Sequence, residues 1–541
     1  MAHPTDVESE LEAAVGRILE SPSRKKLVVA GPGAGKTTLF RKLLDAIDGD
    51  AAQRLVLTFI NALKDDLDRS LGDAATVFTL HGYCQHLLHR EADLRNGLSG
   101  RFRCYPGLAS LIKTDWRWLE QSTAPPFVQL MRDLNCSEEH ATFYFGRANY
   151  YDAVDFDDSV YRTYREMEAN PHHIPGYSLV LIDEFQDFNA MEAAVIDLLA
   201  ADNPILIAGD DDQALYSQLR GASWDHIRAR HASGDYEIFE LPFCMRCPEV
   251  IVEAVNDIIR AARGLEKLNG RIEKPYRYYD PVKGEDSRRY PHIELVETSV
   301  QRNNANYFGQ YIEQCVAAMP TEELQRAAAN NEPAVLVIGS NPYRAQVEAY
   351  LTKAGLYHPP DKSEHSEREI ALQFLAEDPE SNLGWRIMLA CSEETTARDV
   401  VVIAAEQHVS LASLIPDSER TAVLGEATEW AAAHAAEHQG EADGQAVPPV
   451  AITSYEGAKG RSAPYVFLLG LQSGDLPRKP AEIQDIEICR FLVGLTRTKR
   501  KCSILVTRRF GQQFKQRSEF IAWIGPDRLD FKQVDAAYWR G

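Results

Sequence analysis

The 541-residue chain has no apolar run of about 18 residues, so the sequence predicts no membrane-spanning helix and no membrane partner. The first residues, 1–15, are acidic and lack the basic-then-apolar order of a signal peptide. Cysteine is scarce as well: the nine cysteines are scattered, and only Cys244 and Cys247 form a CxxC pair. A four-cysteine zinc site needs a second pair, so reduced cysteines in a cytoplasmic protein are the better interpretation.

Positive charge is also in short supply. Lys and Arg number 58 against 80 Asp and Glu, which gives a formal net charge of −22. A general polyanion binder needs clustered Lys and Arg and is therefore excluded, whereas a local basic groove on an acidic body is not. The hydrophobic fraction of 45% is ordinary for a globular protein with real cores, and the length favours two to four domains.

Short apolar runs bounded by turn residues recur along the chain and predict buried strands between helical stretches. A first series comprises Leu27–Ala30, Leu55–Phe59, Leu179–Ile182, Ile205–Ala208 and Tyr236–Leu241. A second series comprises His292–Thr298, Ala334–Ile338, Val450–Thr453, Tyr465–Leu469 and Cys502–Thr507. Strands that alternate with helices are typical of parallel α/β sheets, so we predict two α/β lobes in tandem.

Each lobe is expected to carry a mainly helical insertion. We assign 1–95 and 177–245 to the first lobe, 96–176 to its insertion, 246–360 and 448–541 to the second lobe, and 361–447 to a reduced insertion. The first insertion is rich in aromatic residues, including Trp116 and Trp118, and is expected to have a small core of its own. The second contains a polar segment at 358–369 and an Ala- and Glu-rich one at 431–449, where we expect linkers between helices.

A glycine-rich segment directly follows the first predicted strand and precedes a helical stretch. It reads Gly31, Pro32, Gly33, Ala34, Gly35, Lys36, Thr37 and Thr38, a P-loop predicted to bind the phosphates of a nucleotide. Glycines let backbone N–H groups approach phosphates, and the following helix adds its positive N-terminus. Lys36 would contact the β- and γ-phosphates, and the Thr37 hydroxyl would hold Mg²⁺.

The strand 179–182 ends in a pair of carboxylates, Asp183 and Glu184. Such a pair alone is usually a solvated loop, but opposite a P-loop it is what an NTPase needs. Asp183 would hold Mg²⁺, and Glu184 would orient and deprotonate the attacking water.

The segment Asp183–Asp187 (DEFQD) resembles the signature of UvrD/Rep-type superfamily 1 helicases. Six further segments are similar to that family's motifs and occur in its order: Thr58–Asn61, Thr79–Gly82, Gly209–Tyr216, Arg246–Pro248, Ser454–Gly460 and Val493–Lys499. The resemblance implies two RecA-like P-loop NTPase lobes in tandem, with one site between them for ATP and Mg²⁺.

The resemblance also implies roles for residues outside the P-loop. Gln213 would sense the γ-phosphate, Arg246 and Arg497 would stabilise the transferring phosphoryl group, and Gly460 would lie at the nucleotide. An arginine aimed at that group is worth about 10³ to 10⁵ in rate, and both arginines belong to the second lobe or its border, so catalysis would require lobe closure. The residues expected to contact DNA are Phe59, Asn61, His81, Tyr216 and Ser454.

The residues expected to contact the base and ribose of the nucleotide differ from the family's pattern. The glutamine expected before the P-loop is absent from residues 10–14, Thr38 replaces an arginine, and Met245 replaces a base-stacking tyrosine. Gly460 is followed by Arg461 and Ser462 in place of Leu and Glu. Lost hydrogen-bonding groups relax discrimination, so we expect weak base preference.

The segments expected to contact the DNA strand also differ from the family's pattern. The spacer after Tyr216, residues 217–219, is one residue longer than in the family and lacks its aromatic platform. Glu456 replaces a histidine and would repel phosphate if it faced the strand. These changes affect processive unwinding more than NTP hydrolysis.

Two functions remain open. The first is an ATP-dependent helicase or translocase moving 3′ to 5′ on single-stranded DNA, with single-stranded or duplex DNA as its partner. The second is a nucleic-acid-gated NTPase subunit that does not unwind alone and works with a nuclease, as in the short UvrD-like subunits of Gabija-type anti-phage systems or in repair. A kinase-like enzyme fits poorly because it needs no second lobe with late arginines. Roughly 40 residues follow the last motif, too few for a fused nuclease domain.

Overall fold

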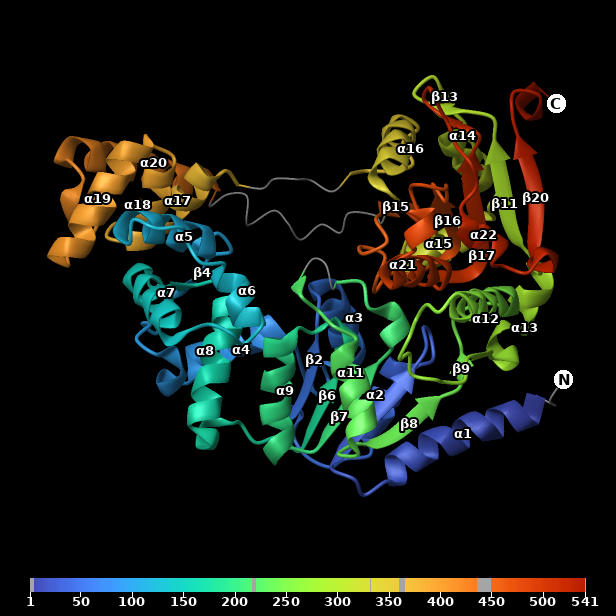
Figure 1. Ribbon diagram of the computed structural model, residues 1–541, viewed down its shortest axis with the longest axis horizontal. Helices are drawn as coiled ribbons and strands as arrows, with labels where there is room; N and C mark the ends of the chain where they lie inside the picture. The colour runs from blue at the N-terminus through green and yellow to red at the C-terminus, as the bar shows by residue number, and fades with distance from the viewer. Residues whose placement is uncertain (1–3, 217–219, 331, 360–364, 435–448, 541) are drawn as a thin grey trace.

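The computed structural model describes residues 4–216, 220–330, 332–359, 365–434 and 449–540 (Figure 1). The spacer 217–219 and parts of the two expected linkers, 360–364 and 435–448, therefore lie outside the described residues. No helix in the described part of the chain is both long and apolar enough to cross a membrane.

The first lobe is built on a six-stranded parallel sheet in the order β3-β2-β6-β7-β1-β8. Its strands are β1 (Lys25–Ala30), β2 (Arg54–Thr58), β3 (Thr76–Thr79), β6 (Leu179–Ile182), β7 (Ile205–Gly209) and β8 (Glu237–Leu241). Leu27 and Val29 pack on one face of the sheet and Val28 and Ala30 on the other. Because helices cover both faces, the central strands of the sheet are mostly apolar: β6 and β7 are buried at every position, as are the last four residues of β1.

The helices of this lobe are α1 (Pro4–Glu20), α2 (Lys36–Asp45), α3 (Asn61–Leu71), α4 (Leu80–Arg90), α9 (Ala190–Asp202) and α11 (Asp225–Ser233). Side chains of α1, α2 and α3 share a core with one sheet face, and those of α4 and α9 share a core with the other.

The second lobe has its own six-stranded parallel sheet, in the order β15-β14-β16-β17-β11-β20. Its strands are β11 (Ile293–Thr298), β14 (Val335–Gly339), β15 (Val450–Thr453), β16 (Ala463–Leu469), β17 (Thr498–Thr507) and β20 (Leu529–Val534). Its helices are α12 (Glu249–Gly264), α13 (Asp280–Arg289), α14 (Tyr307–Ala317), α15 (Thr321–Ala329), α16 (Asn341–Lys353), α21 (Asp485–Leu495) and α22 (Glu519–Ala522). The predicted class, two RecA-like α/β lobes in tandem, is confirmed.

Short strands complete the lobes. β9 (Phe243–Cys244) pairs with β10 (Arg277–Tyr278), and β4 (Arg103–Cys104) pairs with β5 (Ala153–Val154). A small sheet at the outer end of the second lobe contains β12 (Gln301–Arg302), β13 (Ala305–Asn306), β18 (Arg509–Phe510) and β19 (Gln513–Phe514).

The two insertions form one helical module beside the first lobe, across the molecule from the second (Figure 1). The first contributes α5 (Leu108–Leu119), α6 (Phe127–Arg132), α7 (Glu138–Tyr151) and α8 (Phe156–Ala169), and the second contributes α17 (Glu367–Glu377), α18 (Asn382–Ala390), α19 (Glu394–Gln407) and α20 (Asp417–His434). Buried side chains such as Trp116 and Trp385 belong to the same core as one face of the first lobe's sheet. The expectation of a separate small core in the first insertion is therefore wrong, because α17–α20 and the lobe itself cover its apolar side chains.

A buried ion-pair network fixes the two insertions to each other. One carboxylate oxygen of Asp115 on α5 accepts a hydrogen bond from Arg386 Nε on α18 at 3.0 Å. The other oxygen accepts from Arg147 Nε on α7 at 2.9 Å and from the Tyr151 hydroxyl. Asp115 and Arg386 are 0% and 1% exposed, so neither charge has water to replace a lost partner. The residue bounds assigned to lobes and insertions stay a proposal.

Candidate nucleotide site and strand interface

The loop between β1 and α2 forms a cradle lined by backbone. Gly33 and Gly35 adopt positive φ angles of 73° and 86°, which other residues rarely adopt. A Cβ at Gly33 would lie 2.5 Å from Arg246 Cβ, and a Cβ at Gly35 would lie 2.6 Å from Met245 Cε. The first N–H groups of α2 have no side-chain cap and are suited to an anion.

Lys36 begins α2 and pairs with the carboxylates at the end of β6. Its Nζ donates to Glu184 Oε1 at 2.8 Å and lies 3.9 Å from Asp183 Oδ1. Both carboxylates are buried. Burial raises the pKa of Asp183 above its ordinary value. Burial opposes ionisation of Glu184 as well, but the ammonium groups of Lys36 and Lys459 hold its pKa well below the usual range.

Mg²⁺ fits the residues predicted to hold it. Asp183 Oδ1 is buried and accepts no hydrogen bond, so a hard oxygen ligand is available beside Lys36. Thr37 follows Lys36 on the first turn of α2, and its side chain is exposed. Thr38 is exposed too and lies beyond the loop's glycines.

Gln213 joins the two lobes. It ends the short 3₁₀ helix η5 (Asp211–Gln213), and its Nε2 donates to Asp210 Oδ2 at 2.8 Å. Its Oε1 accepts from an Nη of Arg497 at 2.9 Å, and Arg497 lies just after α21 of the second lobe. Arg497 is 3% exposed, and burial together with the nearby Arg246 lowers its pKa to about 10. The two residues, which are 284 positions apart in the chain, are thus in direct contact.

Lys459 is a second contact between the lobes, and it carried no predicted role. It is 2% exposed and donates from Nζ to the carbonyl oxygen of Gln213 at 2.7 Å. The same ammonium pairs with Asp187 and lies 3.4 Å from Glu184 Oε2. In the sequence, only its place in the segment 454–460 indicated that Lys459 could lie near the nucleotide site.

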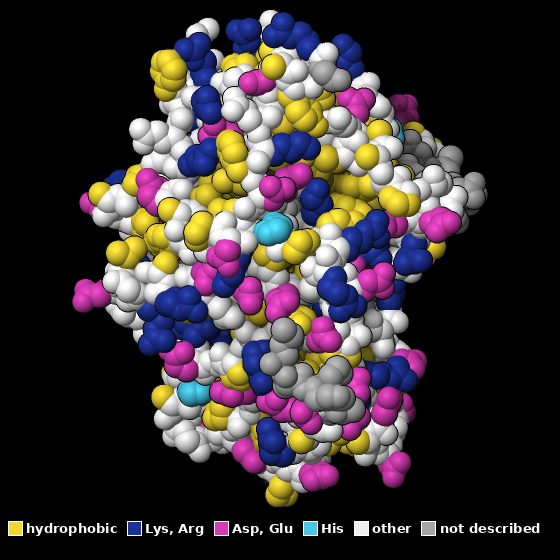
Figure 2. All heavy atoms as spheres, turned by 90° about the vertical axis from the view of Figure 1, so that its right-hand side faces the viewer, with side chains coloured by type: hydrophobic (Ala, Val, Ile, Leu, Met, Phe, Trp, Pro, Cys, Tyr) yellow, Lys and Arg dark blue, Asp and Glu magenta, His cyan; other side chains and the backbone are white. Residues whose placement is uncertain are grey.

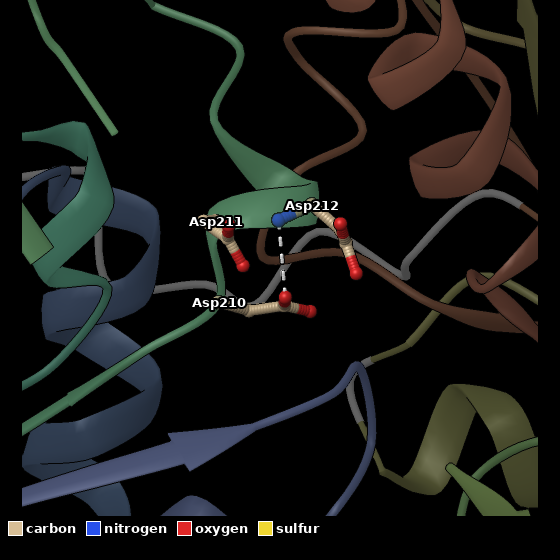
Figure 3. A group of neighbouring side chains, drawn as sticks. All are labelled: Asp210, Asp211 and Asp212. Atoms are coloured by element: carbon tan, nitrogen blue, oxygen red, sulfur yellow. Dashed lines mark hydrogen bonds between the residues drawn. The ribbon is translucent and has the colours of Figure 1, made fainter. Parts of the chain in front are cut away.

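The carboxylates of Asp210, Asp211 and Asp212 gather on one side of η5, within 4.8 Å of one another (Figure 3). Among the described residues this is the one group of three side chains with metal-ligand spacing. The Lys274 ammonium, however, lies 2.8, 2.9 and 2.8 Å from the three carboxylates in turn. Lys274 therefore takes the position that a cation would occupy, and it fixes the segment that leads to Gln213.

Arg246 and its neighbours connect the P-loop to the second lobe. Arg246 Nη1 donates to the carbonyl oxygen of Thr496 at 3.4 Å. Tyr276, which no motif indicated, lies with its ring against Gly31, and its hydroxyl donates to the carbonyl of Pro32 at 3.1 Å. Cys244 and Cys247 are buried there as unlinked thiols, and no third metal-ligating side chain joins them in the described part of the chain.

The aromatic residues predicted to contact DNA cluster where β2 and β3 end. Phe59 is 3% exposed, lies 5.0 Å from the Tyr216 ring between centroids, and is covered by the Arg220 guanidinium at 4.9 Å. His81 is 7% exposed, with its Nε2 3.3 Å from Glu192. Phe59 and His81 are therefore closed to a base in this conformation.

The other predicted strand contacts lie nearby on both lobes. Asn61 is exposed at the start of α3, and the half-buried Ser454 accepts through Oγ from the N–H of Gly457. Gly460, predicted to lie at the nucleotide, has a φ of 82°, and a Cβ there would lie 3.0 Å from Leu63 on α3, so it packs against α3. Glu456 pairs with Arg490 at 2.7 Å, which offsets the charge expected to repel phosphate.

The surface of the second lobe carries both signs of charge. On the face in Figure 2, acidic and basic side chains are interspersed, and Lys and Arg gather towards the top, the end where Figure 1 places β13. Phe514 is 80% exposed at β19 with the Arg509 guanidinium 4.5 Å from its ring centroid. No large single-sign field covers this face.

A P-loop, a carboxylate pair at a strand end and an arginine from a second RecA-like lobe define a tandem-lobe P-loop NTPase. Comparison with known proteins shows which family within this class the chain resembles. Residues 11–141 and 134–233 match the family of the UvrD/REP helicase N-terminal domain. The match lies within the first lobe and its insertion, so this part of the chain is similar to UvrD-type helicases.

Three relatives show how far the similarity extends. The ATP-dependent DNA helicase PcrA of Staphylococcus aureus is 25% identical over 414 residues, 66% of this chain and 54% of the relative. DNA helicase II of Salmonella typhimurium is 26% identical over 310 residues, 50% of this chain and 42% of the relative. The ATP-dependent DNA helicase UvrD1 of Mycobacterium leprae is 26% identical over 350 residues, 52% of this chain and 44% of the relative. The chain thus spans about half the length of the relatives it matches.

Proposed function

We propose that this chain is an ATP-dependent DNA helicase or translocase of UvrD type that moves 3′ to 5′ on single-stranded DNA. The observation that carries the proposal is the contact of Gln213 with Arg497, which joins a nucleotide site on one lobe to an arginine on the other. The names of the three relatives, all DNA helicases, support the choice of substrate.

The proposed hydrolysis uses residues that already lie together. The ATP phosphates occupy the cradle of residues 31–38, and Lys36 moves from Glu184 to the phosphates. Glu184 then orients the attacking water and accepts its proton. Thr37 and Asp183 would hold Mg²⁺, which would neutralise phosphate charge when bound. Gln213, Arg246 and Arg497 stabilise the charge on the transferred group.

The nucleoside side supports relaxed base preference. Met245, in place of a stacking tyrosine, packs on Gly35 and offers no hydrogen-bonding group. Glu10, in the segment that lacks the expected glutamine, is engaged by Arg277. We therefore expect kcat/KM values for ATP, GTP, CTP and UTP to lie within about tenfold of one another. An ATP preference of about a hundredfold would signal real base readout and contradict this expectation.

Directional unwinding tests the motor directly. A duplex with a 3′ single-stranded tail should be unwound in the presence of ATP, and the same duplex with a 5′ tail should not. Unwinding from the 5′ tail alone would reverse the proposed polarity. Hydrolysis without unwinding on either substrate would favour the second candidate.

That second candidate is a nucleic-acid-gated NTPase subunit that works with a nuclease partner. The observation that favours it is the burial of Phe59 and His81, which leaves the strand side without an open platform. A partner that completes the strand-binding surface would then restore unwinding to a chain that only hydrolyses.

A further inference from the structure

A pair of buried cysteines borders the P-loop where the chain passes from the first lobe to the second. Cys244 ends β9, and Cys247 lies two residues before the start of α12. Both are 0% exposed, and neither is linked to another cysteine. Arg246, which is predicted to stabilise the transferred phosphoryl group, lies between them in the chain. The pair therefore belongs to the turn that carries an arginine of the proposed nucleotide site.

The first cysteine lies against the P-loop itself. A Cβ at Gly33 would lie only 3.1 Å from Cys244 Sγ, so the sulfur is in contact with this part of the cradle. The next residue, Met245, donates from its backbone N–H to the Gly33 carbonyl oxygen at 2.9 Å. A change in the backbone around Cys244 is thus transmitted directly to the loop that would hold the phosphates.

The second cysteine lies against the segment that leads to Arg497. Cys247 Sγ is 3.5 Å from the carbonyl oxygen of Thr496, within hydrogen-bonding reach. The same oxygen accepts a hydrogen bond from Arg246 Nη1 at 3.4 Å. The turn between the two cysteines therefore positions Arg246 directly and contacts the residue next to Arg497.

The two thiols contact each other and differ in acidity. Cys244 Sγ accepts a hydrogen bond from the Cys247 N–H at 3.4 Å. Burial opposes ionisation of Cys244, but hydrogen bonds from the thiol and the N–H of Cys247 lower the pKa of Cys244 to about 6. Burial raises the pKa of Cys247 well above its usual range. Near pH 7, Cys244 is therefore the nucleophile of the pair, and Cys247 keeps its proton.

We propose that Cys244 and Cys247 form a reversible intramolecular disulfide that slows hydrolysis at the neighbouring nucleotide site, with a low-molecular-weight disulfide as the oxidant. This inference rests on the proposed hydrolysis and adds a redox modification site to it. Labile disulfides of this kind are regulatory, whereas structural disulfides stay closed.

The reaction is thiol–disulfide exchange in two steps. The Cys244 thiolate attacks one sulfur of glutathione disulfide, whose S–S bond breaks, and the glutathione thiolate that leaves takes a proton from solvent. Cys247 then gives up its proton and attacks Cys244 Sγ of the mixed disulfide, and the second glutathione leaves with that proton. The protein loses two electrons, and one glutathione disulfide is reduced to two glutathione molecules.

The position of the P-loop controls access to the sulfurs. Gly33 covers Cys244, and Thr496 lies against Cys247. The oxidant therefore reaches Cys244 only when the P-loop moves away from β9, and a nucleotide that holds the lobes closed protects the pair. A covalent S–S bond is shorter than a hydrogen bond between two sulfurs, so its formation draws Cys247 towards Cys244 and displaces Arg246.

A peptide map of the full chain detects the disulfide. Trypsin cleaves after Arg246, so the reduced protein yields the two cysteines in separate peptides, 231–246 and 247–260. After treatment with glutathione disulfide and alkylation of the remaining thiols, we expect non-reducing mass spectrometry to find these two peptides joined. Prior addition of Mg²⁺ and a non-hydrolysable ATP analogue should slow the joining at least fivefold.

Activity measurements show what the disulfide does to the site. Oxidation should lower kcat for ATP hydrolysis at least tenfold, because Arg246 is displaced, and dithiothreitol should restore it. The affinity for a fluorescent ATP analogue should fall at least threefold, because the turn also holds Gly33. Each variant is compared with its own activity in dithiothreitol.

Three variants separate the pair from the other cysteines. Cys244→Ser removes the nucleophile, so oxidation should change its kcat less than twofold. Cys247→Ser removes the second thiol, so glutathione should accumulate on Cys244. Cys391→Ser, at an exposed thiol beside α18, is the matched control and should remain as sensitive as the wild type.

Two results would overturn the proposal. One is the absence of the joined peptides when glutathione is found on the exposed Cys391 of the same sample. The other is joined peptides with unchanged kcat, or an equal loss of kcat in Cys244→Ser. A reduced wild type that does not hydrolyse ATP contradicts the proposed function alone, and the joined peptides together with the analogue affinity then decide whether the switch exists.

Discussion

The predicted phosphate side and the predicted strand side of the contact between the two lobes are built in different ways. On the phosphate side, buried ions such as Lys36 and Glu184 already contact one another. On the strand side, the aromatic ring of Phe59 is packed against Tyr216 and covered by Arg220. The proposed chemistry is thus preorganised by short contacts, whereas the proposed strand binding would require side chains to move.

The largest expected effect is the loss of ATP hydrolysis when the predicted phosphate site loses its lysine. Lys36→Ala should abolish ATP hydrolysis, because no other side chain of the P-loop carries a charge to the phosphates. Steady-state phosphate release measures the loss, and thermal unfolding shows that the fold remains. Lys42→Ala, at an exposed lysine further along the same helix, should retain turnover. Activity in Lys36→Ala would remove the phosphate site from this loop.

A second test separates transition-state from ground-state contacts. Arg497→Ala should lower kcat about 10³-fold or more with little change in nucleotide affinity, because the charge contact strengthens as the phosphoryl group transfers. Arg461→Ala, at an exposed arginine of the same lobe, is the control. An Arg497→Ala enzyme with wild-type kcat would place this arginine outside the site.

A third test concerns the module of fused insertions. Arg386→Ala leaves Asp115 short of one partner in a buried network and should lower the free energy of unfolding by about 3–5 kcal/mol. Arg398→Ala removes an exposed ion pair and should change it by less than about 1 kcal/mol. Urea denaturation compares the two. Equal effects would mean that the insertions are not fixed to each other by this network.

The smallest effect is a pH dependence on the strand side. Burial raises the pKa of Glu192, the neighbour of His81, to about 7. The folded state therefore binds a proton more tightly than the unfolded state, so this carboxyl lowers stability as pH rises from about 4.5 to 7, by at most about 3 kcal/mol. Glu192→Gln should be more stable than wild type at pH 8 and not at pH 4.5, by urea denaturation. An equal gain in the free energy of unfolding at both pH values would contradict the raised pKa assigned to Glu192.

The phosphate side was the part most fully anticipated from sequence. The P-loop and the carboxylate pair are local motifs that follow β1 and β6, and the last four residues of each of these strands are apolar and buried. The strands β3 and β20 were not predicted. β3 has only four residues, two of them buried, and β20 is an edge strand in which half of the six side chains are polar and only Val534 is buried.

Contacts between distant segments were not available from any local pattern. Lys274 reaches the three aspartates, and Lys459 reaches Glu184, only because the chain folds two lobes together. The shared core of the two insertions was not predicted for the same reason, because neither insertion alone shows which of its side chains the other will cover. Tyr276 belongs to no motif, and only its packing on Gly31 places it at the P-loop.

The most direct test of the account is steady-state ATP hydrolysis with and without single-stranded DNA, using Glu184→Gln as the blank. We expect hydrolysis that DNA stimulates strongly and that disappears in Glu184→Gln, because the segment 454–460, which contains the predicted strand contact Ser454, reaches Glu184 through Lys459. Hydrolysis that is indifferent to DNA, or that survives in Glu184→Gln, would contradict it.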